Sequence, residues 1–311
     1  AVPSTAATNL QTSAGVNTAL TGNTLTITAP NKSVLTWQAF GSGADSIAVG
    51  DTISYALPSN SSSVLNVVAG GARTQIDGAI SSNGNVFVLN PNGVIVGGGA
   101  RIDTNAFAIS TSGDAAFANY YFQQNGKLPI QDGLGSLAGS TSVATGAIIN
   151  VTDNISIYSK NVDIAGALFS QGNLKVYADG AVALGSAGLT YINGNITVSN
   201  PTGTTTLGSA GNTLNSGGNV IVTSTSGTIV NGATSSFIAK AVTANAGTGD
   251  VSLGKVTSNT VTASGNNVAV ALSSTVNNPL VNVAAAGNAS VTTNGSLTVN
   301  LTNDGTVGTT T

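Results

Sequence analysis

A short phrase recurs along this chain, and it constrains the possible folds more than any other feature. Each copy begins with a glycine followed by asparagine or aspartate, and continues as a strand in which apolar and polar residues alternate. The copies begin at Gly84, Gly172, Gly194, Gly218, Gly249, Gly265 and Gly287. The steps from 172 to 194, from 194 to 218 and from 265 to 287 all measure about 22 residues. Self-similarity at such a period predicts a solenoid, in which each repeat forms one coil.

Residue usage indicates which solenoid to expect. Glu and Met are absent and Lys and Arg total 8, so strong helix formers are scarce, whereas Val, Ile and Thr favour strands. A leucine-rich repeat would share the period, but its Leu-x-x-Leu-x-Leu frame is not visible. We therefore predict an all-β fold, a right-handed single-stranded parallel β-helix (β-solenoid). Residues 182–184, 190–192 and 196–198 are predicted as three strands of one coil, with Asn side chains in the turns stacking coil on coil.

The composition also excludes several classes of function. Cys and His are absent, which excludes zinc sites, iron–sulfur clusters, a haem-ligating His, a Ser–His–Asp triad and a Cys nucleophile. Only 6% of the residues are charged and the net charge is −3, so the chain lacks the basic surface that binds nucleic acid. We expect no cofactor, no metal site and no catalytic residue.

The repeat is less regular at the start of the chain, which predicts three segments. Residues 1–60 are expected to form an N-terminal cap and the first coils, and residues 61–145 a second group of coils with secretion motifs. Residues 146–311 are expected to form repetitive coils of about 22 residues each. Residues 112–127 hold four aromatic residues and interrupt the pattern, so we expect an excursion packed on the side of the solenoid. An aromatic sugar-binding surface is the alternative interpretation of this excursion.

Residues 64–111 contain several motifs in a defined order. They are Val64-Leu65-Asn66, Gln75-Ile76-Asp77-Gly78, Asn83-Gly84-Asn85-Val86-Phe87, Asn90-Pro91-Asn92-Gly93-Val94 and Gly97-Gly98-Gly99-Ala100. In this order and at these gaps, the motifs resemble the two-partner secretion (TPS) domain of filamentous haemagglutinin-type exoproteins and adhesins. The resemblance covers roughly residues 10–125. Val94 stands where the family usually has Ile, which is a conservative departure.

The resemblance implies a partner, an outer-membrane transporter barrel of the TpsB type that guides export. It implies a secretion motif consisting of Asn83, Gly84, Asn85, Asn90, Pro91, Asn92, Gly93 and Val94. The same residues have a local meaning, because Pro91 fixes φ and Asn92-Gly93 would supply positive-φ positions, which predicts a turn between strands at 86–89 and 94–96. Two interpretations stay open: a corner that only fixes the register of the coils, and a corner that also engages the transporter.

We therefore expect a secreted, non-enzymatic β-helical exoprotein that acts in adhesion at the bacterial cell surface. Its ligand would be a host or cell-surface glycan or receptor. The chain begins at Ala1 without a start Met, so we expect export with a cleaved signal peptide. A self-assembling structural subunit of an extracellular filament or biofilm matrix is the alternative. A polysaccharide lyase or hydrolase is a minor alternative, for which Asp153, Lys160, Asp163 and Asp179 form the nearest set of ionisable residues.

The filament alternative has a candidate segment near the C-terminus. Residues 296–301 form an alternating strand with few charges, in which Leu297, Val299 and Leu301 are the apolar positions. An open strand edge recruits another strand unless it is covered. We expect these residues to form an assembly strand. It would pair end to end with the N-terminal region of a second copy and so propagate a filament.

Overall fold

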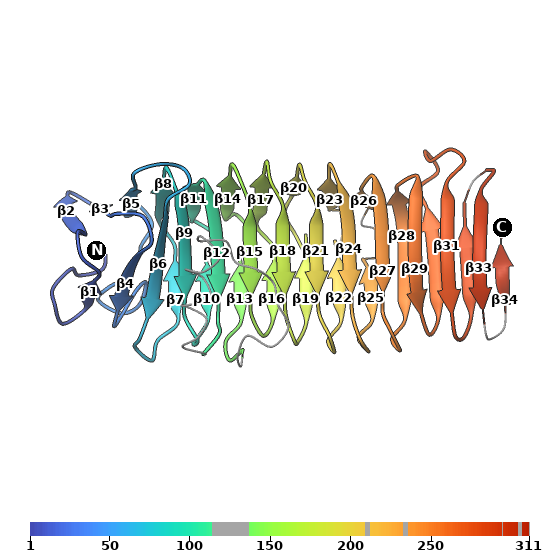
Figure 1. Cartoon of the computed structure of the whole chain (residues 1–311), viewed down its shortest axis with the longest axis horizontal. Helices are drawn as coiled ribbons and strands as arrows, with labels where there is room; N and C mark the ends of the chain where they lie inside the picture. Colours follow the sequence, from blue (N-terminus) through green and yellow to red (C-terminus); the bar gives the residue numbers. More distant parts are fainter. Residues whose placement is uncertain (114–136, 209–211, 233–235, 294, 304–306, 311) are drawn as a thin grey trace. The chain divides into compact units, whose positions relative to one another are not determined.

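The computed structural model describes residues 1–113, 137–208, 212–232, 236–293, 295–303 and 307–310. These residues form strands and turns, and they stack as a parallel β-solenoid of about 10 turns, which confirms the expected fold class (Figure 1). In this described part of the chain, no helical segment has the length and apolar character that a membrane crossing requires. Most of the expected aromatic excursion at 112–127 lies outside the described residues.

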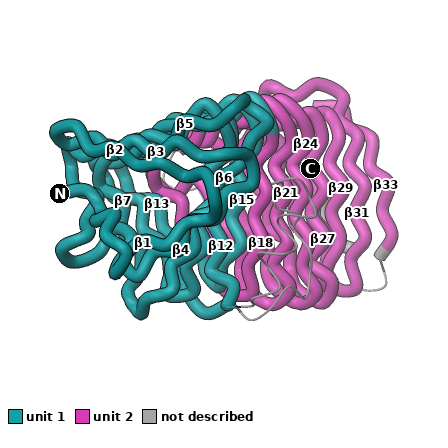
Figure 2. The backbone as a smooth tube through the Cα atoms, turned by 60° about the vertical axis from the view of Figure 1, so that its left-hand side comes forward, with its two compact units in different colours: residues 1–161, 169–172 teal, residues 162–168, 173–311 magenta. Residues whose placement is uncertain are grey.

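The solenoid divides into two compact units (Figure 2). Unit 1 contains residues 1–161 with 169–172, and unit 2 contains residues 162–168 with 173–311. In each unit every coil contributes strands to two sheets, which we call sheet A and sheet B. The three-segment division expected from the sequence is a different partition, and it stays a prediction.

Unit 1 begins with antiparallel strands and continues with parallel coils. Its sheet A consists of β1 (Leu10–Thr12), β4 (Ser33–Trp37), β6 (Ser63–Val68), β9 (Asn85–Leu89), β12 (Ala106–Ser110) and β15 (Ile155–Tyr158). Its sheet B consists of β2 (Asn17–Thr21), β3 (Thr24–Thr28), β5 (Thr52–Ala56), β7 (Thr74–Ile76), β8 (Ala79–Ser82), β10 (Val94–Val96), β11 (Arg101–Thr104), β13 (Thr141–Val143) and β14 (Ile148–Val151). β1 pairs antiparallel with β4 and β2 with β3, whereas β4 pairs in parallel with β6 and β6 with β9.

Unit 2 consists of parallel coils. Its sheet A consists of β18 (Leu174–Tyr177), β21 (Ile196–Ser199), β24 (Asn219–Thr223), β27 (Ala241–Asn245), β29 (Thr260–Gly265), β31 (Leu280–Ala285) and β33 (Thr298–Asn303). Its sheet B consists of β16 (Val162–Ile164), β19 (Val182–Leu184), β20 (Thr190–Ile192), β22 (Thr205–Leu207), β23 (Thr213–Ser216), β25 (Ile229–Asn231), β26 (Ser236–Ile238), β28 (Val251–Thr257), β30 (Val268–Leu272), β32 (Ala289–Thr292) and β34 (Val307–Thr310). β17 (Ala167–Ser170) is divided between the two units.

In the core of unit 2, apolar residues at the equivalent position of successive coils stack on one another in a ladder. In sheet A, register places Ile196 beside Val220, and the column continues through Val242, Val261, Val281 and Val299. The first five of these side chains are essentially fully buried. Each therefore covers its neighbour one coil away, and burial of a valine or isoleucine side chain contributes about 1.5–3 kcal/mol. Alternation puts Thr and Asn on the outer face of the same strands.

Coil length changes within unit 2. β18, β21, β24 and β27 begin at positions 174, 196, 219 and 241, so each of these coils takes about 22 residues. β29, β31 and β33 begin at positions 260, 280 and 298, so the later coils are shorter. The cause is a merger in sheet B, because β25 and β26 both pair with the single longer strand β28. The period expected from the sequence is therefore right for the earlier coils and too long for the later ones.

Polar side chains inside unit 1 bind across the core. The Trp37 Nε1–H and the Tyr55 hydroxyl both donate to Asn66 Oδ1, at 3.0 and 2.8 Å, and all three residues are buried. Asn66 Nδ2 in turn donates to the Phe87 carbonyl at 3.2 Å. Burial raises the pKa of Tyr55 well above its ordinary value, and the hydrogen bond to Asn66 only partly opposes this effect. The network therefore ties β4 and β6 of sheet A to β5 of sheet B.

Glycines stack at one corner of unit 2, because the backbones of successive coils approach too closely there for a side chain. A Cβ added to Gly203 would lie 1.8 Å from the Gly180 carbonyl oxygen. At Gly227 it would lie 2.0 Å from the Gly203 oxygen, and at Gly249 it would lie 2.2 Å from the Gly227 oxygen. Real Cβ atoms do not tolerate such contacts, so this column explains why glycine recurs at the corner.

Replacing Gly203 by alanine tests the glycine column. We expect Gly203→Ala to lower the free energy of unfolding by about 1–3 kcal/mol, because the added methyl forces the backbones of two coils apart. Gly254→Ala is the matched control in the same unit, since its Cβ would meet nothing closer than 3.9 Å. The control should change stability by no more than about 0.5 kcal/mol. Urea unfolding followed by circular dichroism measures both, and equal losses in the two variants would contradict the close-approach argument.

Candidate functional site

The residues of the predicted secretion motif lie together on one coil of unit 1. β9 carries Asn85, a turn over residues 90–93 forms the corner between the two sheets, and β10 begins at Val94. Apolar residues of both strands, Val86, Val88 and Val94 among them, point inward and are buried. The corner therefore joins two strands, both labelled in Figure 1, whose inward side chains are buried in the core.

Asn90 clamps this corner to the coil before it. Its side chain is completely buried. Nδ2 donates to the Ala72 carbonyl at 3.1 Å and to Thr74 Oγ1 at 3.0 Å, and Oδ1 accepts from the Asn92 backbone N–H at 2.9 Å. A buried amide is costly unless its hydrogen bonds are made, and here both ends of the amide are used. Asn90 therefore fixes the position of the turn relative to the preceding coil.

The turn itself differs in one respect from the expectation. The Gly93 N–H donates to the Asn90 carbonyl at 3.1 Å, which closes a four-residue turn with Pro91 and Asn92 at its centre. Gly93 has φ +111°, whereas Asn92 is not among the described residues with positive φ. The expectation that Asn92 also supplies a positive φ is wrong. Asn at the first position, Pro at the second and Gly at the fourth are typical of a type I turn, which needs no positive φ at its centre.

Asn92 contributes through its side chain instead. Its Nδ2 donates to the Gly70 carbonyl of the preceding coil at 2.9 Å and to Asn90 Oδ1 at 3.1 Å. Asn92 is exposed and Pro91 is partly exposed, while Asn90 and Gly93 are buried. The corner therefore exposes Pro91 and Asn92, while the hydrogen bonds of buried Asn90 fix the backbone of the turn.

The other end of the motif is a second, separate contact between coils. Asn83 bonds to both backbone groups of Leu57, accepting at 2.9 Å and donating at 2.7 Å. A Cβ on Gly84 would lie 2.6 Å from the Ser62 carbonyl oxygen, so glycine is required by space. Asn85 Oδ1 accepts from the Asn105 side chain at 2.7 Å. The structure thus brings the eight motif residues onto one coil but at its two ends, and each end contacts neighbouring coils.

Sequence reasoning missed a second copy of the corner, in unit 2. Asn200-Pro201-Thr202-Gly203 follows β21, and Asn200 is completely buried. Asn200 Nδ2 donates to the Gly180 carbonyl at 2.8 Å and to Thr205 Oγ1 at 3.3 Å, and its Oδ1 accepts from the Gly203 N–H at 3.2 Å. The Thr202 hydroxyl donates to the Asp179 carbonyl at 3.2 Å, just as Asn92 reaches the Gly70 carbonyl. The signal was present in the sequence, because Asn-Pro-x-Gly follows a Gly-Asn strand in both places.

The four ionisable residues named for the enzyme alternative are divided between the two units. Asp153 and Lys160 lie in turns of unit 1, and both are exposed. In unit 2, Asp163 accepts a hydrogen bond from the Ser186 hydroxyl at 2.9 Å, and Asp179 lies in the turn after β18. Across the described residues, no three acidic side chains come close enough to hold a metal ion.

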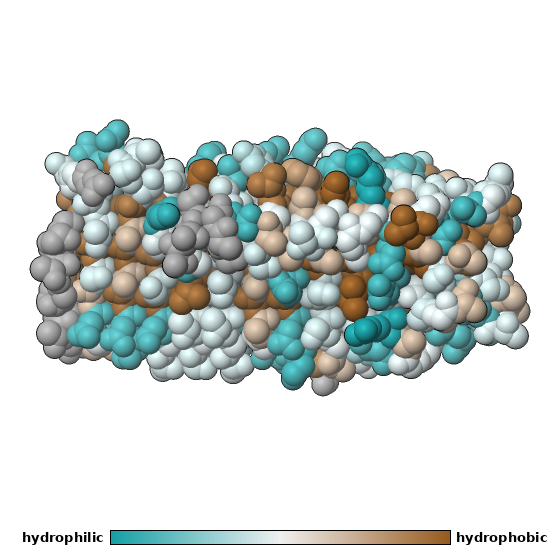
Figure 3. Space-filling model, turned by 180° about the vertical axis from the view of Figure 1, so that it is seen from behind, coloured by the Kyte–Doolittle hydropathy of each residue, from teal (hydrophilic) through white to brown (hydrophobic). Residues whose placement is uncertain are grey.

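The predicted assembly strand lies at the last described sheet A strand of unit 2. β33 pairs in parallel with β31, with Val299 beside Val281 and Leu301 beside Val283. Leu297 and Val299 are half-buried, and Leu301 is 39% exposed. On the surface drawn in Figure 3, apolar residues form separate patches between hydrophilic ones.

Comparison of the sequence with known proteins gives relatives over part of the chain. A heme/hemopexin-binding protein of Haemophilus influenzae is 31% identical over 96 residues, which is 30% of this chain and 10% of that protein. A second H. influenzae protein of the same name is 31% identical over 81 residues, which is 26% of this chain and 8% of that protein. The chain thus matches about a tenth of the length of these curated relatives.

Comparison with solved structures supports the fold. The crystal structure of the HMW1 secretion domain from Haemophilus influenzae matches with a TM-score of 0.51 and 16% sequence identity. The match covers 97% of this chain and 99% of that one. At this identity the likeness concerns the fold, the parallel β-solenoid described above.

The family model of the TPS secretion domain matches residues 2–310, nearly the whole chain. This match extends the resemblance of residues 10–125 through the regular coils of unit 2. TPS exoproteins are secreted across the outer membrane, and a TPS domain implies a TpsB outer-membrane transporter as its partner. The exoproteins of this family are not known as enzymes. The chain belongs to the TPS secretion domain family.

Proposed function

We propose that this chain directs the export of a secreted exoprotein whose task is adhesion at the cell surface, and that the transporter recognises the corner at residues 90–93. The observation that supports the export role is that one residue of this corner holds the turn in place while two others are presented to the outside. Buried Asn90 makes the bonds that hold the turn, while exposed Asn92 and half-exposed Pro91 lie on the outside. A rigid turn that presents an amide and a ring offers a partner a surface that is already ordered, which lowers the entropic cost of binding.

The second corner supplies an internal control for this proposal. Asn92 and Thr202 occupy the same position of the two turns, and each donates one side-chain hydrogen bond to a carbonyl of the coil before it. Asn92 also donates to Asn90 Oδ1, so removing its side chain should cost about 1–2 kcal/mol of stability and removing that of Thr202 about 1 kcal/mol. A purely structural role predicts that secretion follows the measured stability at both corners, whereas recognition by the transporter predicts a loss of secretion at Asn92 beyond its loss of stability.

Paired alanine variants test recognition by the transporter. In bacteria that express the chain with its partner transporter, we expect Asn92→Ala to reduce the secreted fraction several-fold, because the exposed amide is lost. Thr202→Ala should leave secretion at the level of the unaltered chain. The measurement is the ratio of secreted to cell-associated chain, together with the unfolding midpoint of each purified variant. If both variants are secreted alike at similar stability, residue 92 is not read by the transporter.

The adhesive role is supported by the outer face of sheet A in unit 2. There the register aligns Thr197, Ile221, Thr243, Thr262, Asn282 and Asn300 in one column. The column begins with Lys175 on β18, and the six side chains that follow it are uncharged. Asn300 donates to Asn282 at 2.9 Å within the column. Hydroxyl and amide groups at regular spacing suit contact with a polar, uncharged surface better than catalysis.

Attachment of coated particles measures the adhesive role directly. Beads that carry the purified chain should bind host or bacterial cells more than beads that carry an unrelated protein of similar size and charge. Soluble chain added in excess should abolish the difference, because it occupies the same receptors. Attachment that is equal on both kinds of bead would remove adhesion from the proposal and would leave the export role untouched.

A filament subunit is the alternative function, and the half-buried Val299 and exposed Leu301 on β33 favour it. Strand edges with apolar side chains pair with further strands. If this alternative holds, the purified chain forms particles whose length grows with concentration, and deletion of residues 296–311 shortens them. Light scattering and electron microscopy measure the length. A monodisperse monomer at high concentration contradicts it.

A further inference from the structure

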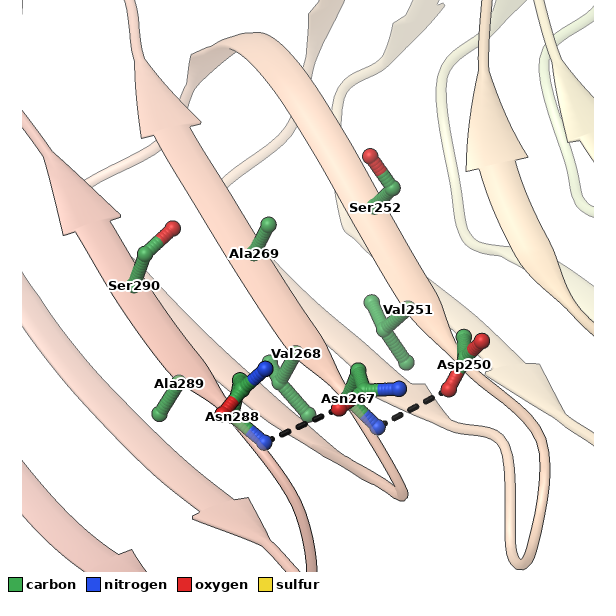
Figure 4. Close-up of a pocket in the computed structure, with 9 residues that line it drawn as sticks. All are labelled: Asp250, Val251, Ser252, Asn267, Val268, Ala269, Asn288, Ala289 and Ser290. Carbon is green, nitrogen blue, oxygen red and sulfur yellow. Dashed lines mark hydrogen bonds between the residues drawn. The ribbon is translucent and has the colours of Figure 1, made fainter. Parts of the chain in front are cut away.

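A shallow groove crosses three coils of unit 2, on the outer face of sheet B. Two adjoining hollows form it, with volumes of about 510 and 410 Å³. Both hollows are lined by Ser252 on β28, Ala269 on β30 and Ser290 on β32, so they are continuous. Figure 4 shows these three side chains in one row, each on the same side of its strand.

The groove has two structural causes. The residues of its floor are small, namely Gly254, Ala271 and the three residues that line both hollows, Ser252, Ala269 and Ser290. In addition, β28 is irregular, because its register against β30 shifts between Leu253 and Val256 and the intervening Lys255 has φ +52°. A bulge bends a strand and changes the contour of the sheet surface. The hollow therefore lies where the two sheet B strands of the earlier coils have merged into one.

One edge of the groove is a row of polar groups held in fixed positions. Asp250 accepts from the Asn267 backbone N–H at 2.9 Å, and Asn267 Oδ1 accepts from the Asn288 backbone N–H at 2.9 Å. Figure 4 shows the three residues in line, two positions before the serine and alanine row of the floor. Because the Asp250 and Asn267 side chains each bond to the backbone of the next coil, these two positions of the row are ordered before any ligand arrives.

The chemistry of this groove selects the kind of ligand. A carboxylate only accepts hydrogen bonds, whereas asparagine and serine side chains both donate and accept. The residues that line the groove include one carboxylate, of Asp250, and no cationic side chain. An anionic polymer would therefore meet the negative charge of Asp250 at the polar edge, and a peptide would find no deep apolar pocket for an anchoring side chain. A neutral sugar chain suits the groove better, because its hydroxyl groups can bond to the serine and asparagine side chains while its apolar ring faces lie on the largely apolar floor.

We propose that this groove binds a neutral oligosaccharide that lies across β28, β30 and β32. Three neighbouring strands span about 10 Å from first to last, which is room for a short run of sugar units. The inference rests on the adhesive role proposed above and names its ligand class. Its test uses purified components, so a failure of sugar binding and a failure of cell attachment are separate results.

A filled groove and its matched control test the proposal. Ala269→Tyr should occupy the shared floor of both hollows and lower affinity at least tenfold. Ala183→Tyr is the control, because Ala183, Thr206, Val230, Ser252 and Ala269 form one outward column of sheet B. Ala183 and Ala269 are both partly exposed, but Ala183 does not line the groove, so its variant should bind like the unaltered chain.

Asn288→Ala removes an exposed amide from the edge without touching the core, and should weaken binding several-fold even if the tyrosine variant folds poorly.

Binding is measured by isothermal titration and by retention on immobilised sugars. The probes are cellohexaose, maltoheptaose and chitohexaose as neutral chains, and a polygalacturonate oligomer as the anionic chain. We expect at least one neutral probe to bind, and the anionic probe to bind at least tenfold more weakly. Absence of binding to all three neutral probes overturns the proposal. So does equal affinity of the Ala269 and Ala183 variants, preference for the anionic chain, or displacement of the sugar by an extended peptide of neutral sequence.

Discussion

Parallel pairing between successive coils is the constraint on which the rest of this molecule depends. In such pairing a residue's nearest neighbours in space are the residues at the same position one coil before and one coil after. A residue type that packs well against an identical residue one coil away is therefore repeated. Valine recurs in the core ladder from Val220 to Val281, asparagine in the turns, and glycine at the corner where the backbones approach closely. The sequence repeat and the structural repeat have the same physical origin, and nearest-neighbour stacking supplies most of the stability.

The same constraint decides how much could be predicted from the sequence. The Gly-Asn phrase predicted both the all-β solenoid and the stacking of turn asparagines, and the Asn195 and Asn219 backbone N–H groups do bond to the asparagine side chains one coil before them. In contrast, no local sequence pattern reveals that β25 and β26 of one coil both pair with the single strand β28 of the next. The shorter coils after β27 and the bulge at Lys255 were therefore missed, although both shape the groove of unit 2.

The predicted secretion motif shows that residue types alone do not settle the geometry of a turn. Asn-Pro-Asn-Gly predicted a corner between two strands, and the structure contains one at that place. The assignment of positive φ to Asn92 was wrong, because a hydrogen bond from its side chain to the preceding coil serves instead. The buried amide of Asn90 could not have been inferred locally, since its partners Ala72 and Thr74 lie a coil away. The second corner at residues 200–203 shows that the same device occurs in both units, so the recognition by the transporter that we propose rests on what differs between the two corners.

Tyr55 in the core of unit 1 has a consequence for the alkaline limit of the fold. Its pKa is raised by burial, so the folded chain keeps this phenol protonated where an unfolded chain would release the proton. The stability that this group contributes is complete below the ordinary tyrosine pKa of about 10 and is lost progressively as the pH rises above it. Elsewhere the described residues form few ion pairs, Ala1 with Asp51 and Arg101 with Asp103. Alkali should therefore weaken the core of unit 1 around Tyr55, while acid and salt have few charged contacts to disrupt among the described residues.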